Sequence, residues 1–434
     1  MKIKSLFEYL VFGLIGVIIG LKLLPEIILV GIILLLVLFI LWQFSEREII
    51  YPVSNLTYLF LLEPYVRAYL PLLPYLFLQY FMIISLIVFQ FNKVHKNKTI
   101  FNWFIFFLLV ILFELINTSR TLDTRFTRSV ILNSLTLLSF IILGIQVNLN
   151  LENLKKLFKN LSYAGFMLTG IVAVAHFQGN INYSLASNFE SSNGMAPVQL
   201  SFYLSFTLVV TYLNYVKFDN NSNRIMYLAI MAIQSTIMIL TFSRGGLYYF
   251  LIIFALINFE SLIKSKISFR YVLGLFLLVP IGAYIYDYTL SVTEGVVAER
   301  YADERTSNRD VLVEVGIEIF KDNPLFGIGT GNFNLVAMDT KYFGSISGAH
   351  NEFVRILAEH GFFGFTFYIL FFLTLFYHML KYRNKIPMVL IPVIMILAFN
   401  FGAIHNGLKL SLQSFTIFIA IAYSNNFIVN GKLK

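Results

Sequence analysis

Three short motifs hold the residues whose types could do chemistry. They are TFSRGG around Arg244, SNRD around Arg309, and AHNEF, which contains His350 and Asn351. An arginine guanidinium pairs with phosphate oxygens through two parallel hydrogen bonds and keeps its charge in partly dry sites. A histidine can accept the proton of a substrate hydroxyl, and an asparagine can cap a helix. Arg244 and Arg309 therefore indicate a phosphate-bearing substrate, with His350 as a general base or hydrogen-bond partner for a hydroxyl.

The other histidines and glycines do not match a metal or nucleotide motif. His350 and His360 are ten residues apart, and HNEF is not the HExxH of a zinc site. The glycine-rich NPLFGIGTGNF stretch at 323–333 lacks the Lys-Ser/Thr ending of a phosphate loop, and no strand precedes it. A turn between two helices explains it at least as well. The chain has no cysteine, which excludes disulfides and thiolate metal sites. We expect neither a metal nor a cofactor.

The composition predicts a membrane protein. Of 434 residues, 58% are hydrophobic and only 13% are charged, whereas soluble domains are about a quarter charged. The chain has too little polar surface to cover an exterior that faces water, so a bilayer must be its solvent. The excess of 32 Lys and Arg over 23 Asp and Glu then records which loops face the cytoplasm. We expect no binding to nucleic acid.

Apolar runs of membrane-spanning length recur along the whole chain. They are at 6–23, 27–44, 72–91, 100–117, 129–147, 161–177, 198–216, 225–242, 246–260, 271–289, 362–379, 387–404 and 411–429. A weaker apolar run lies at 49–62. The Lys and Arg flanks of the spans alternate consistently between the two sides only if this run also crosses the membrane or dips into it. The stretch at 148–160 reads as a separate amphipathic helix on the cytoplasmic surface. We expect an all-α polytopic membrane protein of about 12–14 transmembrane helices, with both termini cytoplasmic.

The two sides of this topology differ in their cations. Lysine dominates the flanks assigned to the cytoplasm, and arginine dominates those assigned outside. The positive-inside rule treats the two residues alike, so a further demand, such as binding a phosphate, is indicated for the outer face. The alternative is that the outer cations only reach the lipid headgroups. A tight hairpin explains the glycines after Arg244, which free the backbone to turn, but it does not explain an arginine there.

One polar segment divides the chain. We expect a transmembrane bundle over 1–289, an extracytoplasmic catalytic loop over 290–361, and C-terminal transmembrane helices over 362–434. The polar segment is too long for a plain connector, and such loops tend to be functional. Helical spacing of apolar residues at 311–320 and at 353–357 predicts short amphipathic helices in or beside it.

The order of these motifs resembles the O-antigen ligase and O-antigen polymerase family. SRGG at 243–246 comes first, then SNRDVLVEVGIEIFKDNPLFGIGTGNF at 307–333, and then AHNEFVRILAEHGFFG at 349–364, followed by a span. The resemblance covers roughly residues 190–380, and the combination is more specific than any single motif. Many members have Ser-Gly-Arg where this sequence has SNRD, so the backbone before Arg309 is less flexible here.

The resemblance implies a metal-independent glycosyltransferase. Such an enzyme takes a glycan from undecaprenyl diphosphate at the outer face of the bacterial inner membrane and joins it to an acceptor hydroxyl. It implies that Arg244 and Arg309 contact the diphosphate and that His350 activates the acceptor. Further candidates for substrate binding are Asn351, Arg305, Arg120, Arg125, Arg128 and His405, and His176 and Lys409 also lie at outer ends of spans. Membrane lipids are expected partners, and a chain-length regulator protein is a candidate partner.

Other functions stay open. A flippase for lipid-linked oligosaccharides would also have many spans, but carriers place ionisable groups near mid-span, whereas here the polar chemistry is in one outer loop. Among enzymes, the acceptor can be another lipid-linked repeat unit, the lipid A core or a protein side chain. The sequence does not separate an O-antigen, capsule or exopolysaccharide polymerase, which we slightly prefer, from a ligase. A protein acceptor is disfavoured because no appended domain follows the last span.

Overall fold

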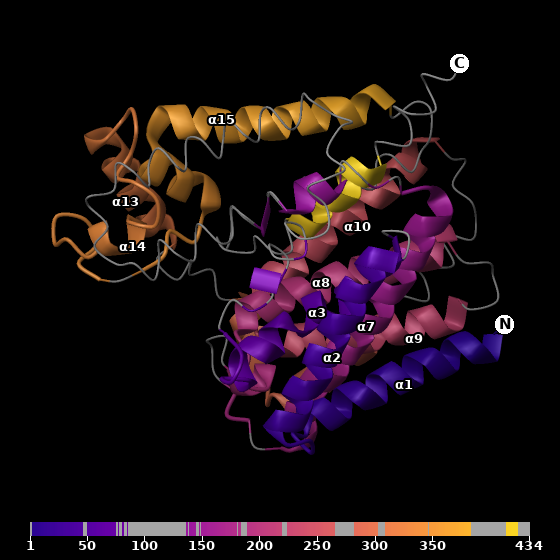
Figure 1. Cartoon of the computed structure of the whole chain (residues 1–434). Coiled ribbons are helices and arrows are strands. Elements are labelled where there is room, and N and C mark those ends of the chain that lie inside the picture. Colours follow the sequence, from indigo (N-terminus) through magenta and orange to yellow (C-terminus); the bar gives the residue numbers. More distant parts are fainter. Residues whose placement is uncertain are drawn as a thin grey trace. The chain divides into compact units, whose positions relative to one another are not determined.

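The computed structural model describes residues 2–46, 50–74, 77, 80–81, 85, 136–137, 139–144, 147, 149–179, 181–183, 189–218, 224–264, 282–302, 309–345, 347–382 and 414–423. Figure 1 shows these parts as helices joined by turns, and no strand occurs among them. The chain forms two compact units. We call them unit 1 (Met1–Tyr75 and Leu151–Glu304) and unit 2 (Leu76–Asn150 and Arg305–Lys434).

Both units are built from helices. Unit 1 contains α1 Lys2–Gly20, α2 Glu26–Glu46, α3 Ile50–Tyr69, α7 Leu151–Phe177, η2 Glu190–Ser192, α8 Pro197–Leu213, η3 Asn214–Phe218, α9 Arg224–Leu240, α10 Arg244–Lys264 and α12 Val296–Ala302. Unit 2 contains α13 Arg309–Asp322, α14 Phe333–Val336, α15 Glu352–Tyr382 and a helical segment at 414–423.

Several helices have the length and composition of membrane spans. In the described part of the chain, four are long and apolar enough to cross a membrane: Glu26–Phe44, Leu151–Phe177, Glu190–Val216 and Glu352–Leu370. A helix satisfies its own backbone hydrogen bonds, which is the requirement for crossing lipid. The predicted all-α polytopic membrane fold is confirmed. The total of 12–14 spans stays a prediction, because the runs at 100–117 and 387–404 lie outside the described residues.

Residues 50–62 of the weak apolar run lie within a complete helix, α3. This helix has 20 residues, which at 1.5 Å per residue is about 30 Å, the thickness of a bilayer core. Its polar side chains are paired within unit 1, because Arg67 bonds to Glu63 and to Gln199 of α8. The Tyr65 hydroxyl donates to the carbonyl of Ile19 (3.0 Å), so α3 and α1 end side by side.

The predicted separate helix at 148–160 is wrong, because α7 runs from Leu151 to Phe177 without a break. Its first turns are amphipathic, as the sequence indicates. Leu154 and Leu157 are buried, while Lys155 and Lys156 are exposed. The residues that follow these turns are mostly buried and continue the same helix. No helix boundary therefore forms where the charged residues end.

Glycines bring α1 and α7 into close contact. An added Cβ at Gly16 would lie 2.0 Å from the Met167 carbonyl oxygen. One at Gly170 would lie 2.5 Å from the Gly13 carbonyl oxygen. Small residues of this kind let two backbones approach, and the resulting van der Waals packing drives helix association in lipid. The α1–α7 pair therefore depends on the absence of side chains at these positions.

We expect Gly16→Leu to destabilise the protein. The leucine side chain would meet the backbone of α7, and overpacking of this kind costs about 1–3 kcal/mol. The measurement is the melting temperature of the protein in detergent. Gly31→Leu in α2 is the matched control, since nothing lies within 4 Å of an added Cβ there. Equal melting temperatures for the two variants would contradict the α1–α7 packing.

One end of unit 1, which we call the turn end, gathers several helix ends. Asn193, just before α8, donates its side-chain amide to the carbonyl of Gly20 at the end of α1 (3.3 Å). Tyr69, at the end of α3, donates to the carbonyl of Asn193 (2.6 Å). The hydroxyl of Ser201 in α8 donates to that of Ser243, between α9 and α10 (2.9 Å). This is the end that the charge pattern assigns to the outer side.

In unit 2, α13 and α15 lie side by side and run in the same direction. An added Cβ at Gly316 of α13 would lie 2.1 Å from the Val354 side chain of α15. Further along, the amide of Phe362 in α15 donates to the carbonyl of Pro324, just after α13 (2.8 Å). The second contact lies eight residues further along the chain in both segments. The two helices are therefore parallel and begin at the same end of unit 2.

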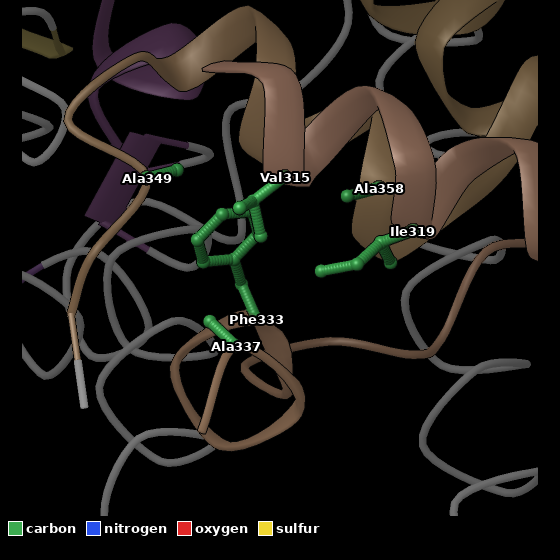
Figure 2. Close-up of a cluster of buried hydrophobic side chains, with 6 residues drawn as sticks. All are labelled: Val315, Ile319, Phe333, Ala337, Ala349 and Ala358. Carbon is green, nitrogen blue, oxygen red and sulfur yellow. The ribbon is translucent and has the colours of Figure 1, made fainter. Parts of the chain in front are cut away.

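A buried apolar core joins α13, α14 and the start of α15. The cluster consists of Val315, Ile319, Phe333, Ala337, Ala349 and Ala358. Figure 2 shows the Phe333 ring beside Val315, and Ala349 on the segment that leads into α15. Burying a large apolar side chain contributes roughly 1.5–3 kcal/mol. Because Ala349 belongs to this core, the chain is anchored directly before His350.

Candidate functional site

Arg244 is the first residue of α10 and follows a tight turn from α9. The turn bends at Phe242, which takes the left-handed conformation (φ 56°). The prediction that the glycines free the backbone to turn is wrong, because Gly245 and Gly246 lie within α10. An added Cβ at Gly246 would lie 2.4 Å from the Ser201 carbonyl oxygen. This glycine therefore allows α10 to approach α8, which holds the turn in place.

Helix α12 supplies hydrogen-bond donors to the same turn. Arg300 Nε donates to the carbonyl of Phe242 (3.3 Å), and the Tyr301 hydroxyl donates to the carbonyl of Ile239 (3.3 Å). Ile239 lies in the last turn of α9 and Phe242 lies in the turn that follows, so α12 is bonded both to the end of α9 and to the turn. Arg300 is thereby placed at the turn that ends in Arg244.

The Tyr301 hydroxyl lies within the field of both arginines. Burial raises the pKa of Tyr301 above the ordinary value of tyrosine, while the charges of Arg300 and Arg244 act in the opposite direction. Tyr301 and Arg300 are also bonded to the residues that lead into Arg244. The spacing of Arg300 in the sequence does not distinguish it from the other cations assigned to the outer side. Its position in the polar segment at 290–361 is the one signal that could have indicated it.

Tyr183 and His176 brace the turn from another side. The Tyr183 ring stacks on Phe242 with centroids 5.3 Å apart, and its hydroxyl is 2.9 Å from His176 Nδ1. His176 Nε2 is 3.0 Å from the Ser191 carbonyl oxygen. A carbonyl can only accept, so Nε2 carries the proton and Nδ1 accepts from Tyr183. Both ring nitrogens of His176 are thus used in holding the turn end together.

In unit 2 the parallel packing of α13 and α15 places Arg309 and His350 at the same end of the helix pair. Arg309 is the first residue of α13, and this helix confirms the prediction from the spacing at 311–320. His350 lies just before α15 and its side chain is exposed, while Arg309 is half-buried. The structure therefore places a cation and a histidine at the same end of this helix pair.

The backbone of His350 has an unusual conformation. Its φ is 48°, in the left-handed region that residues other than glycine rarely adopt. The next residue, Asn351, caps α15 as predicted, because its Oδ1 accepts the N–H of Val354 (3.2 Å). Strained conformations persist only where the surroundings enforce them, and they are frequent at functional sites. The Asn351 cap and the buried Ala349 hold the backbone on both sides of His350.

A buried ion triad lies in the first turns of α15. Arg355 pairs with Glu352, one turn before it, and with Glu359, one turn after it. Glu352 is 2% exposed and Glu359 is 1% exposed. Glu359 Oε1 also accepts the backbone N–H of Phe333 at the start of α14 (3.2 Å). The triad pairs one cation with two carboxylates and ties α14 to α15.

The glycine-rich stretch at 323–333 is a loop packed along α15. The amide of Ile328 donates to the carbonyl of Ala358 (3.0 Å), and that of Gly329 donates to the carbonyl of Glu359 (2.8 Å). These amides are used within the protein and not in a cradle for phosphate. The interpretation of this stretch as a structural turn is therefore supported.

Glycines bring this loop and a kink in α15 together. The kink is at Gly361, which has a φ of 63°. An added Cβ at Gly361 would lie 2.4 Å from the carbonyl carbon of Leu325, and one at Gly327 would lie 2.3 Å from that of Glu359. Each segment therefore has a glycine at the point where it meets the backbone of the other.

The candidate residues fall into three groups. Arg244 belongs to unit 1, with Arg300 at the same turn, and Arg309, His350 and Asn351 belong to unit 2. The candidates that lie outside the described residues are Arg305, Arg120, Arg125, Arg128 and His405. Among the described residues, no group of three or more His, Cys, Asp or Glu side chains could hold a metal ion.

Comparison with known families gives a match in the middle of the chain. The family model described as O-Antigen ligase matches residues 228–369, which extend from α9 into α15. Arg244, Arg309 and His350 all lie within the matched residues. Among curated proteins, no sequence matches this chain. The protein is thus a membrane protein whose residues 228–369 match the family described as O-Antigen ligase.

Proposed function

We propose that the protein is a glycosyltransferase that transfers a glycan from undecaprenyl diphosphate to an acceptor hydroxyl at the outer face of the bacterial inner membrane. The O-antigen ligase domain supports this class of reaction. The observation that carries the proposal is the placement of Arg309 and the exposed His350 at one end of the α13–α15 pair within that domain. A cation for the leaving group and an acceptor for a proton are the two groups that such a reaction needs.

In the proposed reaction, the acceptor hydroxyl oxygen attacks the anomeric carbon of the donor glycan. The new bond joins this carbon to the acceptor oxygen, and the bond from the carbon to the diphosphate oxygen breaks, with its electron pair leaving on the diphosphate. His350 accepts the hydroxyl proton. Arg244 and Arg309 stabilise the charge on the diphosphate through bidentate hydrogen bonds. Guanidinium groups in this role make the proposed reaction independent of a metal ion.

The start of α15 suits the role of a base that must stay in one place. A general base works only within hydrogen-bond reach of the proton that it accepts. The backbone of His350 is held by the buried Ala349 before it and the capped Asn351 after it. The buried triad around Arg355 fixes the helix that follows. The imidazole is thereby presented to solvent from a backbone that has little freedom to move.

We expect His350→Ala, Arg244→Ala and Arg309→Ala each to reduce glycan transfer by about 10²-fold or more, in line with the loss of a general base or of charge stabilisation. Transfer is measured in proteoliposomes that contain a lipid-linked glycan donor and an acceptor. Lys321→Ala in α13 and Arg224→Ala in α9 are matched controls, because each removes an exposed cation from a helix that begins or ends near a candidate. Full activity of His350→Ala would refute the base assignment.

A second expectation concerns the triad. Arg355→Met leaves two buried carboxylates without a counter-charge, which costs about 3–5 kcal/mol, so both the melting temperature and transfer should fall. The control is Lys341→Met, which breaks the exposed ion pair between Lys341 and Asp322 and should change little, since exposed pairs contribute little to stability. The role of the triad would be disproved by an Arg355→Met protein with the melting temperature and turnover of the wild type.

The acceptor distinguishes the members of this class of enzyme. In the proposal, a polymerase uses a second lipid-linked repeat unit and a ligase uses the lipid A core. Proteoliposomes that contain one acceptor at a time separate the two roles. Movement of the lipid-linked glycan across the bilayer without formation of a glycosidic bond would instead indicate a flippase.

A further inference from the structure

We propose that Arg300 binds the same diphosphate as Arg244, so that the α9–α10 turn of unit 1 forms a two-arginine site for a polyprenyl diphosphate. This inference rests on the proposed function, because that function supplies the diphosphate. Arg300 belongs to none of the motifs that suggested the function. Its assignment comes from the contacts of α12.

Arg300 lies at the turn between α9 and α10. Its Nε donates to the carbonyl of Phe242, two residues before Arg244. The neighbouring Tyr301 donates to the carbonyl of Ile239, so α12 is attached to the turn at two points. Both bonds lie within unit 1. The turn therefore carries two guanidinium groups, one from α10 and one from α12.

The second step is the charge at this turn. Two positive groups at one turn raise the local potential and attract an anion. The side chains of Arg244 and Arg300 are both half-buried, and a partly dry site strengthens their electrostatic interactions with a ligand. The opposing effects of both arginines on the pKa of Tyr301 agree with this placement. A site of this kind favours a ligand with more than one negative group.

The third step is the chemistry of the ligand. A guanidinium pairs in bidentate geometry with one phosphate group, so a diphosphate can use two arginines. A phospholipid headgroup offers one phosphate, so the two-arginine site should prefer a diphosphate to a lipid headgroup.

The fourth step is the rigidity of the turn. Phe242 is 1% exposed and is stacked against Tyr183. Ser243 is bonded to Ser201 of α8. Contacts from Tyr183 and Ser201 thus hold the backbone of the two residues directly before Arg244. A preorganised pair of cations binds its ligand without the cost of ordering the chain.

The test measures the binding of farnesyl diphosphate to the full-length protein in nanodiscs. Arg300→Gln removes the charge and retains an N–H donor for the Phe242 carbonyl, so the turn should keep its structure. We expect the Kd for farnesyl diphosphate to rise roughly tenfold or more, since losing a charge-assisted hydrogen bond is worth at least that factor. The Kd for farnesyl monophosphate should change much less. Arg300→Lys, which keeps the charge and loses the fork, should show an intermediate loss.

Tyr301→Phe is the matched control, because it removes the other bond from α12 to the turn without a change in charge. If Arg300 acts on the ligand and not only on the turn, the Kd of Tyr301→Phe for farnesyl diphosphate should lie within about twofold of the wild-type value. Equal losses for Tyr301→Phe and Arg300→Gln, or no loss for Arg300→Gln and Arg300→Lys, would overturn the inference. So would a wild-type protein that does not bind farnesyl diphosphate, or one from which phosphatidylglycerol displaces it at equal concentration.

The outcome also separates this inference from the proposed function. Binding of farnesyl diphosphate that depends on Arg300, in a protein that transfers no glycan to any acceptor, would keep the site and reject the proposed function. Glycan transfer by a wild-type protein, together with an unchanged KM for the lipid-linked donor in Arg300→Gln, would keep the function and reject the role of Arg300.

Discussion

The arrangement of unit 2 depends on the pairing of one buried arginine with two buried carboxylates at the start of α15. Arg355 is placed between Glu352 and Glu359 on one helix, and removing charges from water is costly unless each is paired. Glu359 also bonds to the amide of Phe333, so the pairing extends to α14. Few arrangements of α14 and α15 pair Arg355 with both carboxylates and also give the Phe333 amide an acceptor. The end of unit 2 that holds Arg309 and His350 is therefore determined by charge as well as by apolar packing.

Unit 1 positions its arginines by a different physical means. Helices α8 and α10 approach closely because Gly246 has no side chain to meet the Ser201 backbone. The carbonyls of Ile239 and Phe242 at the resulting turn accept hydrogen bonds from Tyr301 and Arg300 of α12. Arg300 thereby lies at the same turn as Arg244.

Much of this could be predicted from the sequence, because it follows from hydropathy and local spacing. The membrane fold, α13 and the cap by Asn351 are local features of this kind. The left-handed Phe242 and the contact of Arg300 with its carbonyl could not be predicted, since they depend on packing between segments far apart in the chain. The triad gave a signal in its helical spacing, but spacing alone does not show that its carboxylates are buried.

The crossing of the glycine-rich loop with the kink of α15 has an evolutionary consequence. Gly327 and Gly361 each face the backbone of the opposite segment at a distance that no Cβ can occupy. A substitution at either position would push the two segments apart, and no change at the other could relieve it. Relatives in which these two segments cross should keep both glycines. They should also keep the length of the chain directly beside each glycine. Variation in length should then accumulate at 338–341, an exposed stretch that lies outside it.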